Sequence, residues 1–267
     1  MCRVDSAIWE QIDLNRRRFL AASIALLATT VTSPSGVSAA AERKTLADLV
    51  RASQSARLTA PEGTAVFGSV EVRSNSLKGL PQWTRVLAIM RAEQPTFDRC
   101  VEDGANCATP VLKNWREVIR SAKGRSRRDK LKTVNEFFNR WPYKLDTEVY
   151  GLSEYWATPR EFMTRSGDCE DFAIAKYFAL RKLGFSNDEM RIVILWDDIR
   201  GIGHAILAIY EANDILVLDS LSNLILSHSR YKQYKPQYSM NETTRWAHIG
   251  GFKKLNTQPY QGLASKN

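Results

Sequence analysis

The chain has 267 residues, of which 44% are hydrophobic and 25% charged, and its formal net charge is +9. This length accommodates one large domain or two small ones, and the composition is ordinary for a globular protein. The positive charge is mostly dispersed and the chain begins like an exported protein, so we do not interpret the charge as a nucleic-acid-binding surface.

Residues 1–40 have the features of an export signal. The pair Arg16 and Arg17 precedes an apolar run over Phe19–Val31, which is too short to span a bilayer comfortably. Small residues at 38–40 suit a signal peptidase. The pattern resembles a bacterial twin-arginine signal, and the alternatives are an ordinary secretory signal or a retained anchor. Each of these places the mature protein outside the cytoplasm, and we expect a periplasmic protein that is not an integral membrane protein once processed.

The first half of the mature chain is predicted to be mostly helical, with one short strand within 66–72. Proline at the first helical position and Ser or Thr as the N-cap are typical helix starts. Such starts occur at Pro81, Thr109-Pro110, Ser126 and Thr158-Pro159. The helix that follows Ser126 is expected to bury Trp141 and to stop at Pro142.

A dense basic run opens the helix that follows Ser126. Its members are Lys123, Arg125, Arg127, Arg128, Lys130 and Lys132. We interpret the run as a solvated helix face. A docking surface for an acidic partner or an anionic lipid is the alternative.

The four cysteines are not equivalent. Cys2 leaves with the signal, and Cys100 and Cys107 lie seven residues apart in a polar, turn-rich segment. In an oxidising compartment this pair predicts a disulfide that closes a short loop. A metal site there is disfavoured because no histidine or third cysteine is near. Cys169 is then a free thiol in an exported protein, which requires an explanation.

Cys169 stands at a predicted helix start. Gly167 ends the preceding segment, Asp168 is a good N-cap, and Asp171 can complete a capping box. The helix is predicted to run through apolar residues to Gly184 and to be buried. The field of the helix N-terminus favours a thiolate at Cys169, whereas the three neighbouring carboxylates disfavour it. Either the cysteine is inert, as a structural residue would be, or a cation binds beside it.

After Cys169 the pattern changes to strands, at 191–196, 204–210 and 215–219. In a hairpin with a two- or four-residue loop, His204 and Asp219 fall on the same face, directly opposite or one diagonal step apart. Separately, His204 could be a core histidine and Asp219 a turn residue. Together with Cys169 they form a nucleophile, a base and a residue that orients the base. His228 and His248 have no comparable setting.

This order and spacing resemble the transglutaminase-like cysteine peptidases, and more narrowly the bacterial transglutaminase-like cysteine proteinase family. The resemblance covers residues 64–249. Its matching stretches are Val134–Asn139, Tyr143–Asp146, Tyr155–Glu161, Gly167–Ala173, Gly203–Ala205, Leu218–Asp219 and Tyr238–Asn241. Papain-type enzymes are disfavoured because the gap between their cysteine and histidine is much longer.

The resemblance implies an α+β fold with a papain-like core, whose helical N-terminal half packs on an antiparallel β-sheet. It also implies a Cys169-His204-Asp219 triad. In one branch of the family it further implies Ca²⁺, here with Asp168, Glu170 and Asp171 as ligands. A surface adhesin as substrate and an inner-membrane regulatory protein are the partners it suggests. Ser220 and the stretch Arg245–His248 depart from the pattern we expect of that branch.

We therefore expect four segments: an export signal at 1–40, a polar segment at 41–63, a cysteine peptidase domain at 64–252 and a tail at 253–267. The favoured function is a calcium-dependent cysteine endopeptidase acting on an exported or surface protein. Acyl transfer to an amine on the same triad is the second function. The third is a non-catalytic, calcium-responsive binding module.

Overall fold

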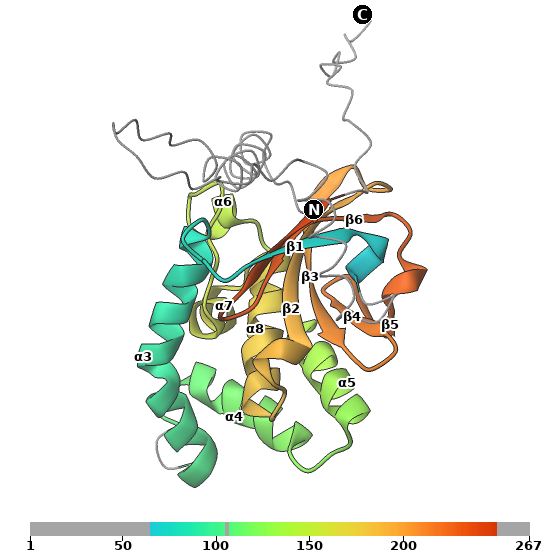
Figure 1. The fold of residues 1–267 in the computed structure, drawn as a ribbon. Coiled ribbons are helices and arrows are strands. Elements are labelled where there is room, and N and C mark those ends of the chain that lie inside the picture. The colour runs from blue at the N-terminus through green and yellow to red at the C-terminus, as the bar shows by residue number, and fades with distance from the viewer. Residues whose placement is uncertain (1–64, 105–106, 250–267) are drawn as a thin grey trace, which may run out of the picture.

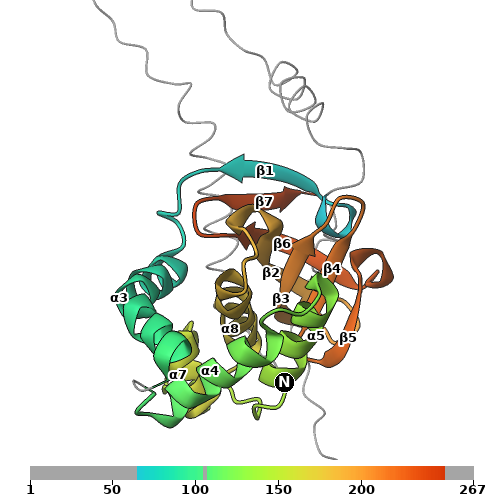
Figure 2. The same cartoon turned by 90° about the horizontal axis from the view of Figure 1, so that it is seen from below.

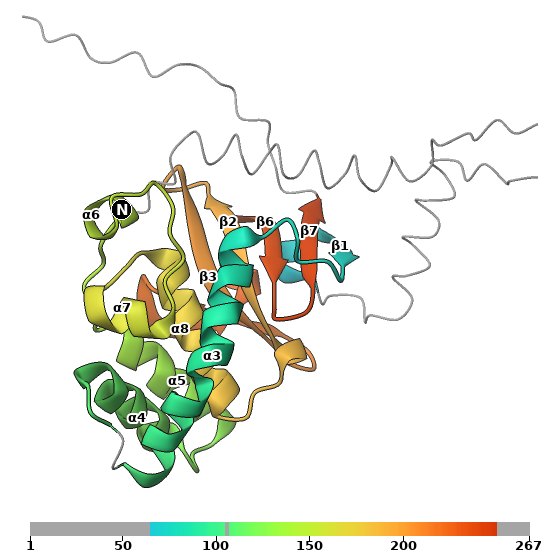
Figure 3. The same cartoon turned by 90° about the vertical axis from the view of Figure 1, so that its left-hand side faces the viewer.

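The computed structural model describes residues 65–104 and 107–249. The predicted export signal, the polar segment after it and the C-terminal tail lie outside these residues. The described residues form a mixed fold, in which helices pack onto one face of an antiparallel sheet (Figure 1). This confirms the predicted fold class. The side view separates the helical layer from the strands (Figure 3).

Among the described residues, six α-helices precede most of the sheet in the chain. They are α3 (Pro81–Asp103), α4 (Pro110–Ala122), α5 (Arg127–Phe138), α6 (Asp146–Val149), α7 (Pro159–Arg165) and α8 (Cys169–Lys182). The helix starts predicted from the caps are confirmed. The Thr109 hydroxyl accepts from the Leu112 N–H, and Thr158 with Glu161 forms a capping box at α7.

Two local predictions need correction. Helix α5 ends at Phe138, so Trp141 lies beyond it and contributes its ring to an aromatic cluster with Phe137 and Phe162. The strand predicted within 66–72 is split into a 3₁₀ turn and strand β1, because Phe67 adopts a left-handed conformation with φ of 52°.

The sheet has seven strands in the order β1-β7-β6-β2-β3-β4-β5, all paired antiparallel. They are β1 (Val70–Ser74), β2 (Met190–Asp197), β3 (Ile202–Tyr210), β4 (Ile215–Asp219), β5 (Ser222–Ser227), β6 (Tyr234–Met240) and β7 (Arg245–Ile249). The first strand therefore pairs with the last. Both faces of the central strands are buried, which accounts for their nearly continuous apolar sequence.

Helix α8 lies at the centre of the molecule, between the other helices and the sheet (Figures 1 and 2). It contacts β2 and β3 on one side and α4, α5 and α7 on the other. Its residues from Cys169 to Leu180 are all buried, as the sequence predicts. A rigid, buried helix therefore carries the free cysteine at its first residue.

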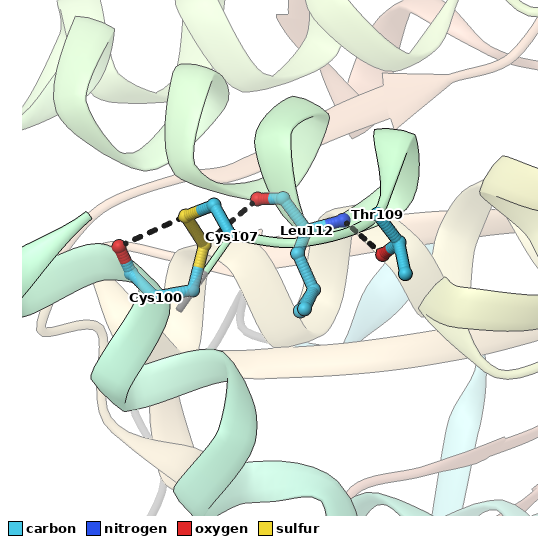
Figure 4. Close-up of a disulfide and its surroundings, with 4 residues drawn as sticks. All are labelled: Cys100, Cys107, Thr109 and Leu112. Atoms are coloured by element: carbon cyan, nitrogen blue, oxygen red, sulfur yellow. Dashed lines mark hydrogen bonds between the residues drawn. A yellow bond between two sulfur atoms is a disulfide. The ribbon is translucent and has the colours of Figure 1, made fainter. Parts of the chain in front are cut away.

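The predicted disulfide is present. Cys100 in the last turn of α3 is bonded to Cys107 in the segment before α4, with 4.9 Å between their Cα atoms (Figure 4). Both residues are buried, and the Cys100 sulfur lies 3.1 Å from the Leu112 carbonyl oxygen. Cys169 is the free cysteine among the described residues.

The basic run at the start of α5 is more than a solvated face. Arg127 forms ion pairs with Glu189 and Glu211, each at 3.0 Å. Arg128 donates to the Ile225 carbonyl at 2.8 Å. These contacts fasten α5 to the sheet and to the segments beside β2 and β3, and the Arg128 side chain covers a backbone acceptor of the edge strand β5.

Candidate active site

At the start of α8 the backbone passes very close to the Asp171 side chain. Asp171 accepts hydrogen bonds from the Asp168 N–H at 3.3 Å and from the Ala157 N–H at 2.6 Å. A Cβ atom at Gly167 would lie 1.9 Å from the Asp171 carboxylate, so only glycine fits there. These contacts fix the turn that presents Cys169.

The Cys169 side chain lies at the helix mouth and is 2% exposed. Its thiol donates to the Glu170 carboxylate, with 3.3 Å between Sγ and Oε2. The α8 helix packs against β2 and β3, and β3 carries His204. The fold therefore brings the helix of the cysteine and the strand of the histidine together.

His204 and Asp219 meet as the hairpin pattern predicts. Strand β3 pairs with β4 so that Leu207 faces Leu218 and Tyr210 faces Ile215, which sets His204 one diagonal step from Asp219. The His204 Nε2 and Asp219 Oδ1 atoms are 2.8 Å apart, and both residues are 1% exposed. With its proton on Nε2 donated to Asp219, the imidazole has Nδ1 as its proton-accepting atom.

Two further donors hold the Asp219 carboxylate. The Tyr234 hydroxyl donates to Oδ2 at 2.6 Å, and the Leu221 N–H donates to Oδ1 at 3.0 Å. Burial alone would raise the pKa of Asp219, but the charge and hydrogen bond of His204 and the other donors outweigh it and hold the pKa well below its usual range. Asp219 is therefore ionised and able to orient an imidazole.

Tyr234 is not among the site residues predicted from the sequence. It opens β6, which joins the sheet beside β2, and the register between these strands shifts between Ile194 and Leu195. No local spacing relates Tyr234 to Asp219, so no signal in the sequence alone could have identified it.

Acidic side chains gather in two overlapping groups that could hold a cation. One consists of Asp168, Cys169 and Glu170, and the other of Asp146, Asp168 and Asp171; the ligand atoms within each group lie within 4.8 Å of one another. The predicted residues Asp168, Glu170 and Asp171 thus all lie in these groups, but they are divided between them.

Asp146 was missed as a site residue because it lies 22 residues before Asp168 in the chain. The structure brings it close through a bridge between Tyr143 and Gly167, where the Lys144 N–H donates to the Gly167 carbonyl at 2.9 Å. Burial and the charges of Asp168 and Asp146 raise the pKa of Asp171 well above its usual value. An all-oxygen group with this much unbalanced negative charge fits a hard divalent cation.

The fold and this site define a cysteine peptidase of the transglutaminase-like class. The sequence profile of the bacterial transglutaminase-like cysteine proteinases matches residues 91–254, and the chain belongs to this family.

The chain is similar to solved structures of LapG. LapG from Legionella pneumophila is 32% identical, with a TM-score of 0.50 over 57% of this chain and 87% of LapG. An EGTA-treated LapG structure from the same species is 32% identical, with a TM-score of 0.51 over 58% of this chain and 86% of that one. No curated protein matches the chain. Within residues 65–104 and 107–249, no helix is both long and apolar enough to cross a membrane.

Proposed function

We propose that this cysteine peptidase is a calcium-dependent endopeptidase that cleaves an exported or surface protein, with Cys169, His204 and Asp219 as its triad. One observation carries the proposal. It is the buried 2.8 Å hydrogen bond between His204 on β3 and Asp219 on β4, with β3 packed against the helix that begins with Cys169. Family membership supports the same chemistry.

In the proposed reaction Cys169 attacks the carbonyl carbon of the scissile peptide bond. The His204 Nδ1 takes the thiol proton and then delivers it to the leaving amine, which leaves an acyl thioester on Cys169. Backbone N–H groups at the mouth of α8 would stabilise the oxyanion, and Asp219 would stabilise the imidazolium. Water, activated by His204, then releases the acyl product.

We propose Asp146, Asp168 and Asp171 as the carboxylate ligands of the calcium ion, with Glu170 in the adjoining group at the thiol. The ion would offset the repulsion among these carboxylates and fix the turn that presents Cys169. Hard oxygen ligands favour Ca²⁺ over a thiolate-preferring metal.

Calorimetry tests the calcium site directly. We expect Ca²⁺ to bind more tightly than Mg²⁺, and Asp146→Asn and Asp168→Asn each to abolish the binding heat. Glu148→Gln is the matched control, because Glu148 is an exposed carboxylate on α6 outside both groups. Chelation should suppress cleavage and added calcium should restore it. Full activity after exhaustive chelation, without a calcium heat, would refute the metal site.

The proposed location is the periplasm, after removal of residues 1–40 and with residues 64–252 as the peptidase domain. The twin arginines and the small residues at 38–40 support this proposal. Sequencing the amino terminus of periplasmic protein should find a start near residue 41. A start at Met1 would contradict it.

The substrate is proposed to be a surface adhesin, and an inner-membrane regulatory protein is the proposed partner. Incubating candidate surface proteins with the peptidase should yield new amino termini. A labelled primary amine in the same reaction distinguishes the chemistry, because incorporation of the label without cleavage would indicate acyl transfer instead of hydrolysis.

A further inference from the structure

A fully buried lysine links the helix of the nucleophile to the strand of the triad aspartate. Lys176 is 0% exposed, and its Nζ donates to the backbone carbonyl of Asp219 at 3.1 Å. It follows Cys169 by seven residues, which is about two helical turns, so both residues lie on the same side of α8. That side faces β3.

Packing does not account for a lysine at this position. Transfer of an ammonium group into the interior is costly, and lysine is almost never fully buried unless it is paired. Burial lowers the pKa of Lys176 to about 7, and the Asp219 charge partly opposes this shift. The cation also lies 5.9 Å from the centroid of the Phe172 ring. Methionine would fill similar space without the desolvation cost.

The carbonyl that Lys176 contacts is a second anchoring point of Asp219. It also accepts from the Asn139 Nδ2 at 3.0 Å, and Asn139 donates to the Ser222 carbonyl at 3.0 Å as well. The carboxylate of Asp219 is held independently by its three other donors. The turn between β4 and β5 is thus fastened at its backbone by α5 and α8, and Lys176 is the donor that comes from the helix of Cys169.

We propose that Lys176 is a positioning residue of the peptidase, which holds Asp219, and through it the His204 imidazole, in place relative to Cys169. The proposal rests on the triad proposed above. Because α8 is a continuous buried helix, the distance between Cys169 at its first position and Lys176 is fixed. Loss of the hydrogen bond would free the end of β4, and small displacements of catalytic groups lower the rate strongly.

Kinetics of Lys176→Met test this role. We expect kcat to fall by at least about tenfold while KM stays within about twofold, because substrate contacts are unchanged and alignment is lost. The downfield proton resonance of the imidazole N–H between His204 and Asp219 should shift or broaden. Tyr177→Phe is the matched control. It removes hydrogen bonds to Asn187 and Glu242 on another side of the same helix, and it should leave kcat and the resonance unchanged.

A folded Lys176→Met protein with unchanged kcat and an unchanged His204 resonance would overturn the proposal. If that variant does not fold, Lys176→Gln decides. Its neutral side chain is one atom shorter and ends before the Asp219 carbonyl that Lys176 reaches, and unchanged kcat and resonance in it would overturn the proposal. Failure of the triad itself would appear separately, as cleavage retained in Cys169→Ala, while the resonance would still report whether Lys176 acts on the His204–Asp219 pair.

Discussion

Asp219 is the residue on which most contacts of the site converge. Its carboxylate accepts from His204, Tyr234 and the Leu221 N–H, and its carbonyl accepts from Lys176 and Asn139. Because several hydrogen-bond donors contact this buried carboxylate, it stays ionised and its side chain is held in one orientation. The geometry is that expected for a residue that selects one imidazole tautomer.

Asp219→Asn is expected to lower kcat by about 10²–10⁴ with little effect on folding, because the amide favours the wrong tautomer of His204. The measurement is kcat/KM for cleavage, with circular dichroism as a check on the fold. Ser220→Ala is the control at the next position. Activity of Asp219→Asn equal to that of the wild type would exclude Asp219 as the orienting residue.

The sequence predicts the parts of the site that local geometry determines. The capping pattern around Cys169 and the hairpin carrying His204 and Asp219 are both set within about 20 residues, where helix and hairpin rules apply. Asp146, Tyr234 and Lys176 depend on contacts between distant elements. In the sequence, Lys176 is only a polar residue within a helix that is predicted to be buried. The helical repeat does not indicate that its partner is the Asp219 carbonyl.

For the secondary-structure elements too, local sequence patterns predict what local geometry determines and fail for contacts between distant segments. The starts of α4, α5 and α7 follow from their caps and are confirmed. The sheet order could not be derived, because β1 precedes the helices and pairs with β7 at the opposite end of the chain. Long-range pairing of this kind has no local signature.

The disulfide joins the last turn of α3 to the segment before α4. In the chain-entropy account, closing a loop of about eight residues stabilises the fold by about 2–3 kcal/mol. We expect the double variant Cys100→Ala and Cys107→Ala to lose stability of this order, measured by denaturant unfolding, without losing cleavage. Alkylation of the mature wild-type protein without a reductant should label one thiol. Labelling of three thiols would contradict the disulfide.

At the scale of the whole molecule, a buried histidine connects the first strand region to the last strands of the sheet. His248 lies 2.7 Å from the Ser69 hydroxyl through Nδ1 and 2.9 Å from the Ser239 hydroxyl through Nε2. Ser69 donates its proton to the Val66 carbonyl, so Nδ1 carries the imidazole proton. The charged neighbours are Glu71, at 3.9 Å, and Arg191, which pairs with Glu71.

Burial lowers the pKa of His248 from 6.5 to about 4. Between these values the unfolded chain binds more protons than the folded chain, so stability rises with pH through this window. The stability that depends on a neutral His248 is fully present above about pH 6.5. It is lost as the pH falls towards 4, and the total loss in the free energy of unfolding is roughly 2–4 kcal/mol. His248→Gln should be less stable at neutral pH but should show a shallower loss between pH 6.5 and 4. Equal slopes in denaturant unfolding would contradict this account.

The central claim is that Cys169 is the nucleophile of a calcium-dependent peptidase. The most direct measurement is the rate at which new amino termini appear in periplasmic and surface proteins, collected from cells lacking this protein and incubated with it in calcium. We expect cleavage at defined sites by the wild type, and none above background by Cys169→Ala, by His204→Ala or after chelation. The same termini produced at the wild-type rate by a folded Cys169→Ala protein would contradict it.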